Sequence, residues 1–331
     1  MYNDEWKNKF LLESRQSSMQ NRIAPRLFNH SAIYEEKLQK DLCAIDDKDI
    51  LLEILASITG GKIAITSKYR NLIVDYVKWC RDENYSGVSD LIEEITDEDI
   101  VERRISECMV ADPSGLQKYL NNVFREETEN FVDNTARCYF WLAFAGVPYL
   151  EASKVTVADV DLDIIDGEFI VRNNGVSYSI PSIGFEAVKK CAELNAFVIE
   201  TESPRKEGRF TYITPRKEGN LLLRGAEPKR GKQSKEDKRD PILAAVQKLI
   251  YLTAKKRGRK IMYYSDIRLS GFFCRLYEQE KREQMADQKP NFTQAFREFE
   301  LKSSDKKNIR SQSYYTKKYY EIWKKFFKNN F

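Results

Sequence analysis

The side chains that most often carry out acid–base chemistry are scarce in this sequence. Its only histidine, His30, lies in the polar stretch RLFNHS, away from any apolar segment that could form a pocket. General acid–base catalysis most often uses an imidazole, so an enzyme built on this chain would have to use other groups. We expect His30 to be an ordinary surface residue.

The cysteines do not follow a metal-binding or disulfide pattern. None belongs to a CxxC pair, and most lie within apolar or amphipathic runs. This usage is typical of free thiols in a reducing compartment. We therefore expect no zinc site, no disulfide framework and no cofactor. The six residues are Cys43, Cys80, Cys108, Cys138, Cys191 and Cys274.

Positive charge is concentrated in the second half of the chain. The net charge is +4 over 331 residues, but residues 201–260 carry 18 Lys and Arg against 7 Asp and Glu. Residues 301–331 carry 9 against 2. Such segregation indicates a polyanionic partner. For residues 201–240, a solvated lysine-rich loop is the alternative interpretation.

A helical region precedes these basic segments. Apolar residues recur every three or four positions through residues 1–56, and the pattern stops at Gly60–Gly61. Thr66 and Ser67 are candidate N-caps for the next helix. Its predicted buried stripe is Tyr69, Leu72, Ile73, Tyr76, Val77 and Cys80. Two shorter helices follow, so residues 1–112 are expected to form an α-helical region.

Residues 113–331 are expected to form a second, mixed domain. A turn at Pro113–Gly115 leads to a core helix ending near Gly146, and three alternating segments (154–163, 167–173 and 175–181) predict a small antiparallel sheet. Residues 182–200 return to helix in this prediction. A basic connector, 203–241, holds one short strand, FTYIT, and helices close the domain. The predicted fold class is mainly α with a small antiparallel β-sheet.

The chain carries no signal for a membrane. Its longest apolar run, residues 138–150, is interrupted by a Gly and a Pro and is too short to span a bilayer. The N-terminus lacks the apolar segment of a signal peptide. We expect a cytoplasmic protein.

The order of the motifs resembles the tyrosine recombinases, or phage integrases. In that family a helix ends in Gly–hydrophobic–Arg, followed by Glu and a strand with two Asp residues. Gly146, Glu151, Asp159 and Asp161 match this block, and YSDIRLS (264–270) is similar to the family's second arginine motif. The resemblance implies a core-binding domain at about 60–112 and a catalytic-like domain, together forming a clamp on double-stranded DNA.

The resemblance also shows which chemistry is missing. The family uses a tyrosine to attack a phosphodiester, two arginines to hold its oxygens, and a lysine and histidines to move protons. Only the second arginine remains, as Arg268, for which a phosphate contact and a surface helix position are both open. The other positions carry Pro148, Asn173–Asn174, Ser265 and Leu269. Since each preorganised donor contributes about two to three orders of magnitude in rate, we expect no catalysis.

The leading hypothesis is a sequence-specific DNA-binding protein with an inactive recombinase fold. The resemblance to the integrase-like repressors of SPβ-type temperate phages implies a transcriptional repressor that maintains lysogeny. The alternatives are a divergent active recombinase using Arg268 with Tyr314 or Tyr315, and a protein-interaction scaffold. We expect the tail tyrosines to pack in a core, and the tail to support possible homo-oligomers. The predicted DNA contacts are Lys68, Arg70, Lys255, Lys256, Arg257, Arg259, Lys260, Arg268, Lys317 and Lys318.

Overall fold

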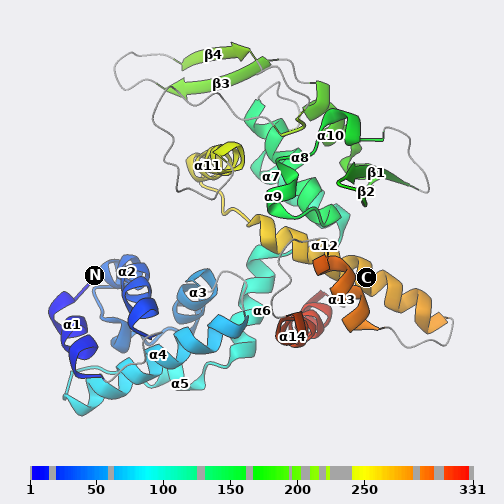
Figure 1. Ribbon diagram of the computed structural model, residues 1–331. Coiled ribbons are helices and arrows are strands. Elements are labelled where there is room, and N and C mark those ends of the chain that lie inside the picture. Colours follow the sequence, from blue (N-terminus) through cyan, green and yellow to red (C-terminus); the bar gives the residue numbers. More distant parts are fainter. Residues whose placement is uncertain are drawn as a thin grey trace. The chain divides into compact units, whose positions relative to one another are not determined.

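The chain is mostly α-helical, with two small antiparallel hairpins (Figure 1). The computed structural model describes residues 2–14, 20–58, 63–124, 131–161, 167–193, 196–202, 209–215, 221–223, 241–285, 291–301 and 309–327. This architecture confirms the predicted fold class. Within the described residues, no helix is both long enough and apolar enough to cross a membrane.

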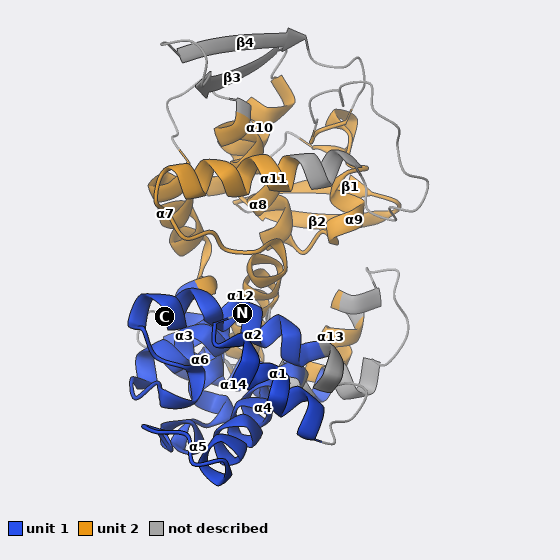
Figure 2. Ribbon diagram, turned by 90° about the vertical axis from the view of Figure 1, so that its left-hand side faces the viewer, with its two compact units in different colours: residues 1–107, 310–331 blue, residues 108–309 orange. Residues whose placement is uncertain are grey.

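The chain divides into two compact units (Figure 2). Unit 1 comprises Met1–Glu107 together with Arg310–Phe331, and unit 2 comprises Cys108–Ile309. The sequence placed the boundary at residue 112 and the tail with the second domain. The structure instead places the tail with the N-terminal unit, because the last helix has an apolar face that is buried there.

Unit 1 is an all-helical bundle with its own core. Its helices are α1 (Asp4–Glu13), α2 (Gln20–Leu38), α3 (Lys48–Ile58), α4 (Ile63–Asp82), α5 (Leu91–Glu94), α6 (Asp97–Cys108) and α14 (Ile309–Phe327). The predicted stripe of α4, from Tyr69 to Cys80, is buried as expected. The N-cap prediction was wrong. The helix begins at Ile63, so Thr66 and Ser67 lie inside it, where Thr66 is buried and Ser67 donates to Asp97 at 2.5 Å.

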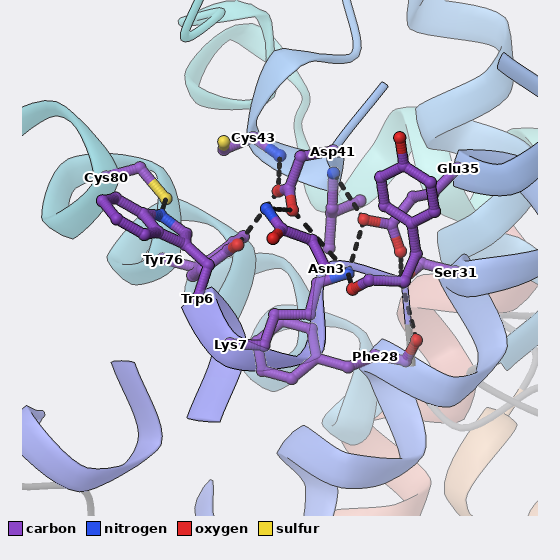
Figure 3. Close-up of polar contacts among 12 residues, drawn as sticks. Asn3, Trp6, Lys7, Phe28, Ser31, Glu35, Asp41, Cys43, Tyr76 and Cys80 are labelled. Carbon is purple, nitrogen blue, oxygen red and sulfur yellow. Dashed lines mark hydrogen bonds and ion pairs between the residues drawn. The ribbon is translucent and has the colours of Figure 1, made fainter. Parts of the chain in front are cut away.

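A buried polar cluster joins α1 to the rest of unit 1 (Figure 3). The Lys7 ammonium lies 2.5 Å from Glu35 Oε1, and both side chains are fully buried. Glu35 also accepts hydrogen bonds from Ser31 Oγ at 2.8 Å and from the Leu42 amide at 2.6 Å. Asp41 lies 4.0 Å from the Lys7 ammonium. The cluster therefore holds α1 through a charged group that has no access to water.

His30 is half-buried rather than fully exposed, contrary to expectation. Its Nε2 lies 2.7 Å from Ser57 Oγ, across the contact between α2 and α3. Burial, followed by the charge of Arg26, lowers its pKa below the ordinary value of 6.5. The residue thus contributes to helix packing. All six cysteines are also buried and free.

Helix α14 packs on unit 1 through an apolar face and two ion pairs. Tyr319, Tyr320 and Trp323 are buried, as expected for the tail tyrosines. On its polar side, Lys318 lies 3.6 Å from Glu98, and a second lysine pairs with α6 further along. Tyr314 differs, since it is 69% exposed. The side chain of Tyr315 lies outside the described residues.

Unit 2 is organised around α8, which is almost completely buried. Its elements are α7 (Pro113–Val123), α8 (Phe131–Ala145), α9 (Tyr149–Ala152), β1 (Glu168–Asn173), β2 (Val176–Pro181), α10 (Phe185–Glu193), β3 (Ala196–Glu202), β4 (Arg209–Pro215), α11 (Pro241–Lys256), α12 (Tyr264–Met285) and α13 (Phe292–Leu301). Helices α10, α11 and α12 all pack against α8 (Figure 2). At Gly271, α12 approaches so closely that an added Cβ would lie 1.9 Å from the Phe144 carbonyl oxygen.

Two sequence predictions for unit 2 were wrong. The alternating segment 154–163 gives no strand within its described part. Val157–Asp159 form a 3-10 turn, and only isolated bridges flank it. The residues AFVIE, predicted as helix, form strand β3, which pairs with β4 in an antiparallel hairpin. Strand β4 contains the predicted FTYIT strand. Most of the basic connector, and the Gly60–Gly61 helix stop, lie outside the described residues.

Candidate nucleic-acid interface

The corner between α8 and α9 is where the sequence departs from the expected chemistry. Helix α8 ends at Ala145 and is followed by Gly146, whose φ of +98° is a left-handed conformation that suits glycine. The Val147 amide donates to the Leu142 carbonyl at 3.1 Å, which closes the helix end. Pro148 is buried and starts α9 with φ −62°. Pro148 therefore redirects the chain.

Glu151 connects this corner to the β1–β2 turn. Its carboxylate accepts from Asn174 Nδ2 at 2.6 Å, and its backbone carbonyl accepts from Asn173 Nδ2 at 3.0 Å. Asn174 and Gly175 both have positive φ, as in the tight turns that join two hairpin strands. At the turn where the resemblance expects a lysine, the structure thus has amides bonded to a neighbouring acid.

The paired aspartates also have local structural roles. Asp159 accepts from the Thr156 amide at 2.7 Å and from its hydroxyl at 2.8 Å, forming a capping box. Asp161 lies 2.9 Å from Arg172 on β1. These contacts attach the segment after α9 to the hairpin.

Arg268, at the start of α12, faces the corner. Its Nε donates to the Gly146 carbonyl at 2.9 Å, and its Nη2 donates to the Phe299 carbonyl at 3.2 Å. The guanidinium also lies 4.0 Å from the centre of the Phe299 ring. Neighbouring Ser265 is exposed and Leu269 is half-buried. Arg268 is therefore half-buried, with two of its N–H groups bonded to backbone carbonyls and an aromatic ring over its guanidinium.

The C-terminal end of α11 presents exposed cations. Lys255, Lys256, Arg259 and Lys260 are all exposed. Arg257, between them, differs. Its guanidinium bonds both oxygens of buried Asp133, at 2.6 and 3.0 Å, and donates to the Val123 carbonyl at 2.8 Å. Arg257 thus anchors the basic end to α7 and α8. We call the four exposed residues the α11 basic end.

The cations predicted for unit 1 lie on two helices. Lys68 on α4 is exposed, whereas Arg70 donates to the Ile95 carbonyl at 2.9 Å and lies 3.5 Å from Asp97. On α14, Lys317 and Lys318 are exposed, and Lys318 pairs with Glu98. Lys68, Lys317 and Lys318 are therefore the exposed positions of this set.

Sequence reasoning missed two residues around the corner. Arg275 lies two turns after Arg268 on α12, and its Nη1 donates to the Phe144 carbonyl at 2.8 Å. Phe299 on α13 covers Arg268. The seven-residue spacing of the two arginines was a usable signal that both face one side of the helix. Among the described residues, no group of His, Cys, Asp or Glu could hold a metal ion.

Comparison with known proteins gives one family match. Residues 1–82 match the family model described as MrpR, N-terminal core-binding domain. The match begins well before the core-binding region predicted at 60–112, and it includes α1 and its buried polar cluster. No curated protein matches this chain significantly.

Solved structures give matches at low identity. The lambda integrase (residues 75–356) bound to DNA is 13% identical, with 86% of this chain and 89% of that chain covered and a TM-score of 0.28. The Tn1549 transposon integrase in complex with a circular intermediate DNA is 12% identical, with 94% and 93% covered and a TM-score of 0.30. At these values the matches assign neither an activity nor a site to this chain.

Proposed function

We propose that this chain is a sequence-specific protein for double-stranded DNA that lacks strand-transfer chemistry and represses transcription to maintain the lysogeny of a phage. The observation that carries the DNA-binding part is the α11 basic end, with two exposed lysines in the last turn of the helix and two exposed cations directly after it. Clustered cations of this kind neutralise phosphates and release counterions. The core-binding family match of residues 1–82 supports the same partner. The repressor role, and a cytoplasmic location on DNA, rest on the resemblance of the sequence motifs.

The contacts of Arg268 support the absence of catalysis. A phosphate-holding arginine must direct its N–H groups toward the substrate. Here Nε and Nη2 donate to the carbonyls of Gly146 and Phe299. Pro148 and Ser265 supply no charge at the other positions. An enzyme with these residues would lack most of the stabilisation that phosphoryl transfer requires.

One observation favours the alternative of a divergent recombinase. Tyr314 is exposed, as a nucleophile needs to be. A nicked suicide substrate separates the two proposals, because an active enzyme becomes trapped covalently on it. We expect no protein–DNA adduct. An adduct that disappears in Tyr314→Phe or Tyr315→Phe would replace the repressor with the recombinase.

The DNA-binding proposal is tested by fluorescence anisotropy with duplexes from promoters of the mobile element that carries the gene. We expect binding that weakens steeply with salt. In Lys255→Gln and Lys256→Gln the salt slope should fall by about one for each phosphate that the variant no longer neutralises. Lys118→Gln, at an exposed position on α7, is the matched control and should keep the parental slope. If no duplex binds even at low salt, the protein-interaction scaffold remains as the alternative function.

The biological role needs a separate measurement. Mapping of bound sites across the native host genome should place this protein at promoters of the element. Sites confined to attachment sequences would argue against a repressor. Sedimentation of the full chain, with and without DNA, tests the proposed homo-oligomer.

A further inference from the structure

A cavity of about 280 Å³ lies in unit 2 beside the α8–α9 corner. Its walls come from the end of α8, strand β2, the middle of α12 and the last turns of α13. The volume is close to the lower end of known small-molecule sites, about 300 Å³. Its main lining residues are Ser177, Tyr178, Phe272, Arg275, Gln279 and Phe299.

Arg275 supplies the charge of this cavity. Its guanidinium donates from Nη1 to the Phe144 carbonyl, although such a group has five N–H donors. Within the described part of the chain, no carboxylate lies within ion-pair distance of it. Burial lowers the pKa of Arg275 to about 10, so the group stays protonated at neutral pH. A half-buried cation with one carbonyl partner has donors left for an anion.

The two acidic groups whose charges act on Arg275 have other partners. Glu168 on β1 accepts a hydrogen bond from the Ser179 hydroxyl. Glu278 on α12 accepts from the Cys274 thiol at 3.8 Å. Arg268, two turns earlier on α12, adds a second positive charge. Of these charged groups, Arg275 is the one that lines the cavity, and it is therefore the recognition group for an incoming carboxylate.

Part of the remaining wall is apolar, and Ser177, Ser179 and Gln279 supply polar groups. The rings of Phe272 and Phe299 are stacked, with centroids 4.4 Å apart, and Leu276 and Ala295 also line the cavity. At Gly146, a Cβ would lie 3.0 Å from Arg275 Nη2, so the glycine leaves room for the guanidinium. A charged donor against aromatic walls suits a ligand with a carboxylate at one end and an apolar body at the other.

We propose that this cavity binds a small organic acid, whose carboxylate pairs with Arg275 and whose apolar body lies against Phe272 and Phe299. This site is separate from the α11 basic end, and its test requires no DNA. A backbone phosphate of DNA would use the charge alone and leave the apolar walls uncovered.

Benzoate is the probe, tested on the full chain by saturation-transfer NMR and by titration. We expect saturable binding in the millimolar range. Arg275→Gln should weaken it about 10- to 100-fold, the range of a charge-assisted hydrogen bond. Arg282→Gln, exposed on the same helix, is the matched control and should bind benzoate as the parent does. Benzyl alcohol, which keeps the ring without the charge, should bind far more weakly.

Ser177→Phe provides an independent variant, because Ser177 is exposed at the mouth and Arg275 is unchanged. It should block benzoate entry while circular dichroism shows a parental helix content. If Arg275→Gln does not fold, this variant decides the question. The proposal is overturned if benzoate does not bind, if it binds equally to Arg275→Gln or Ser177→Phe, or if benzyl alcohol binds as tightly.

Discussion

Replacement of Lys7 by Met tests the buried ion pair that attaches α1 to unit 1 (Figure 3). The variant keeps the apolar stem but leaves the Glu35 carboxylate without its cation. Both side chains are fully buried, at a distance of 2.5 Å. Removal of one member of such a pair costs about 3–5 kcal/mol of unfolding free energy, since an uncompensated charge stays in the interior.

The loss of unfolding free energy in Lys7→Met should depend on pH in a defined direction. Burial already raises the pKa of Glu35, while Lys7 opposes this effect. Without Lys7, the folded-state pKa rises further above its unfolded value, so the native state binds more protons than the unfolded state over a wider window. Stability then falls as pH rises through the folded-state pKa. Lys7→Met should therefore lose less at pH 5 than at pH 8.

Urea unfolding followed by tryptophan fluorescence is a suitable assay, because Trp6 on α1 packs against Trp79 at 5.3 Å. The double variant Lys7→Met with Glu35→Leu should recover most of the loss, since it removes both charges. Lys9→Met, at an exposed pair on the same helix, should cause no measurable change. The reasoning fails if Lys7→Met is as stable as the parent at pH 8, or if removal of Glu35 restores nothing.

Three further predictions concern unit 2 and His30. Gly271→Ala should destabilise unit 2 by about 2–3 kcal/mol, seen as a lower melting temperature, because its Cβ would overlap the Phe144 carbonyl. Arg257→Gln should cost about 2–4 kcal/mol in urea unfolding, because it removes the cation that bonds both oxygens of buried Asp133. A loss of DNA affinity at unchanged stability would instead reassign Arg257 to the interface. The lowered pKa of His30 contributes stability that is present above about pH 6.5 and is lost as pH falls through the folded-state pKa. His30→Gln should therefore reduce the fall in unfolding free energy on the acid side of the pH profile. If that fall is unchanged in the variant, His30 is not its source.

Local patterns predicted the helices well because their burial is periodic. The apolar stripe of α4 follows directly from spacing in the sequence, whereas α8 is buried on all sides and was predicted as a core helix that ends near Gly146. The same approach failed at residues 154–163. The alternation there is real, but Thr156 and Asp159 form a capping box that folds the backbone into a 3-10 turn. Strand β3 was missed since its partner β4 follows a connector, and that pairing is not visible within one segment.

At the candidate site, the sequence likewise identified charged residues but not the partners that the fold gives them. Residue types and spacing identified Lys255, Arg257 and Arg268 as cations that could hold phosphate. Whether a guanidinium is available depends on which acceptors the fold brings to it. For Arg257 the acceptor is Asp133, which lies more than a hundred residues away in the sequence. Only the exposed lysines could be assigned to a surface from the sequence, because their helix ends in a polar segment.

The contacts around Gly146 support the proposal that catalysis has been lost. Pro148 alone could be regarded as a lost arginine, which one replacement would restore. The carbonyl of Gly146, however, accepts from Arg268, and Phe299 covers the same guanidinium. At the turn, Asn173 and Asn174 are bonded to Glu151. An arginine at position 148 would therefore meet an Arg268 with two N–H groups bonded to backbone carbonyls, and a turn whose side chains support the corner. Asn173, Asn174 and Arg268 thus all make local structural contacts at this corner.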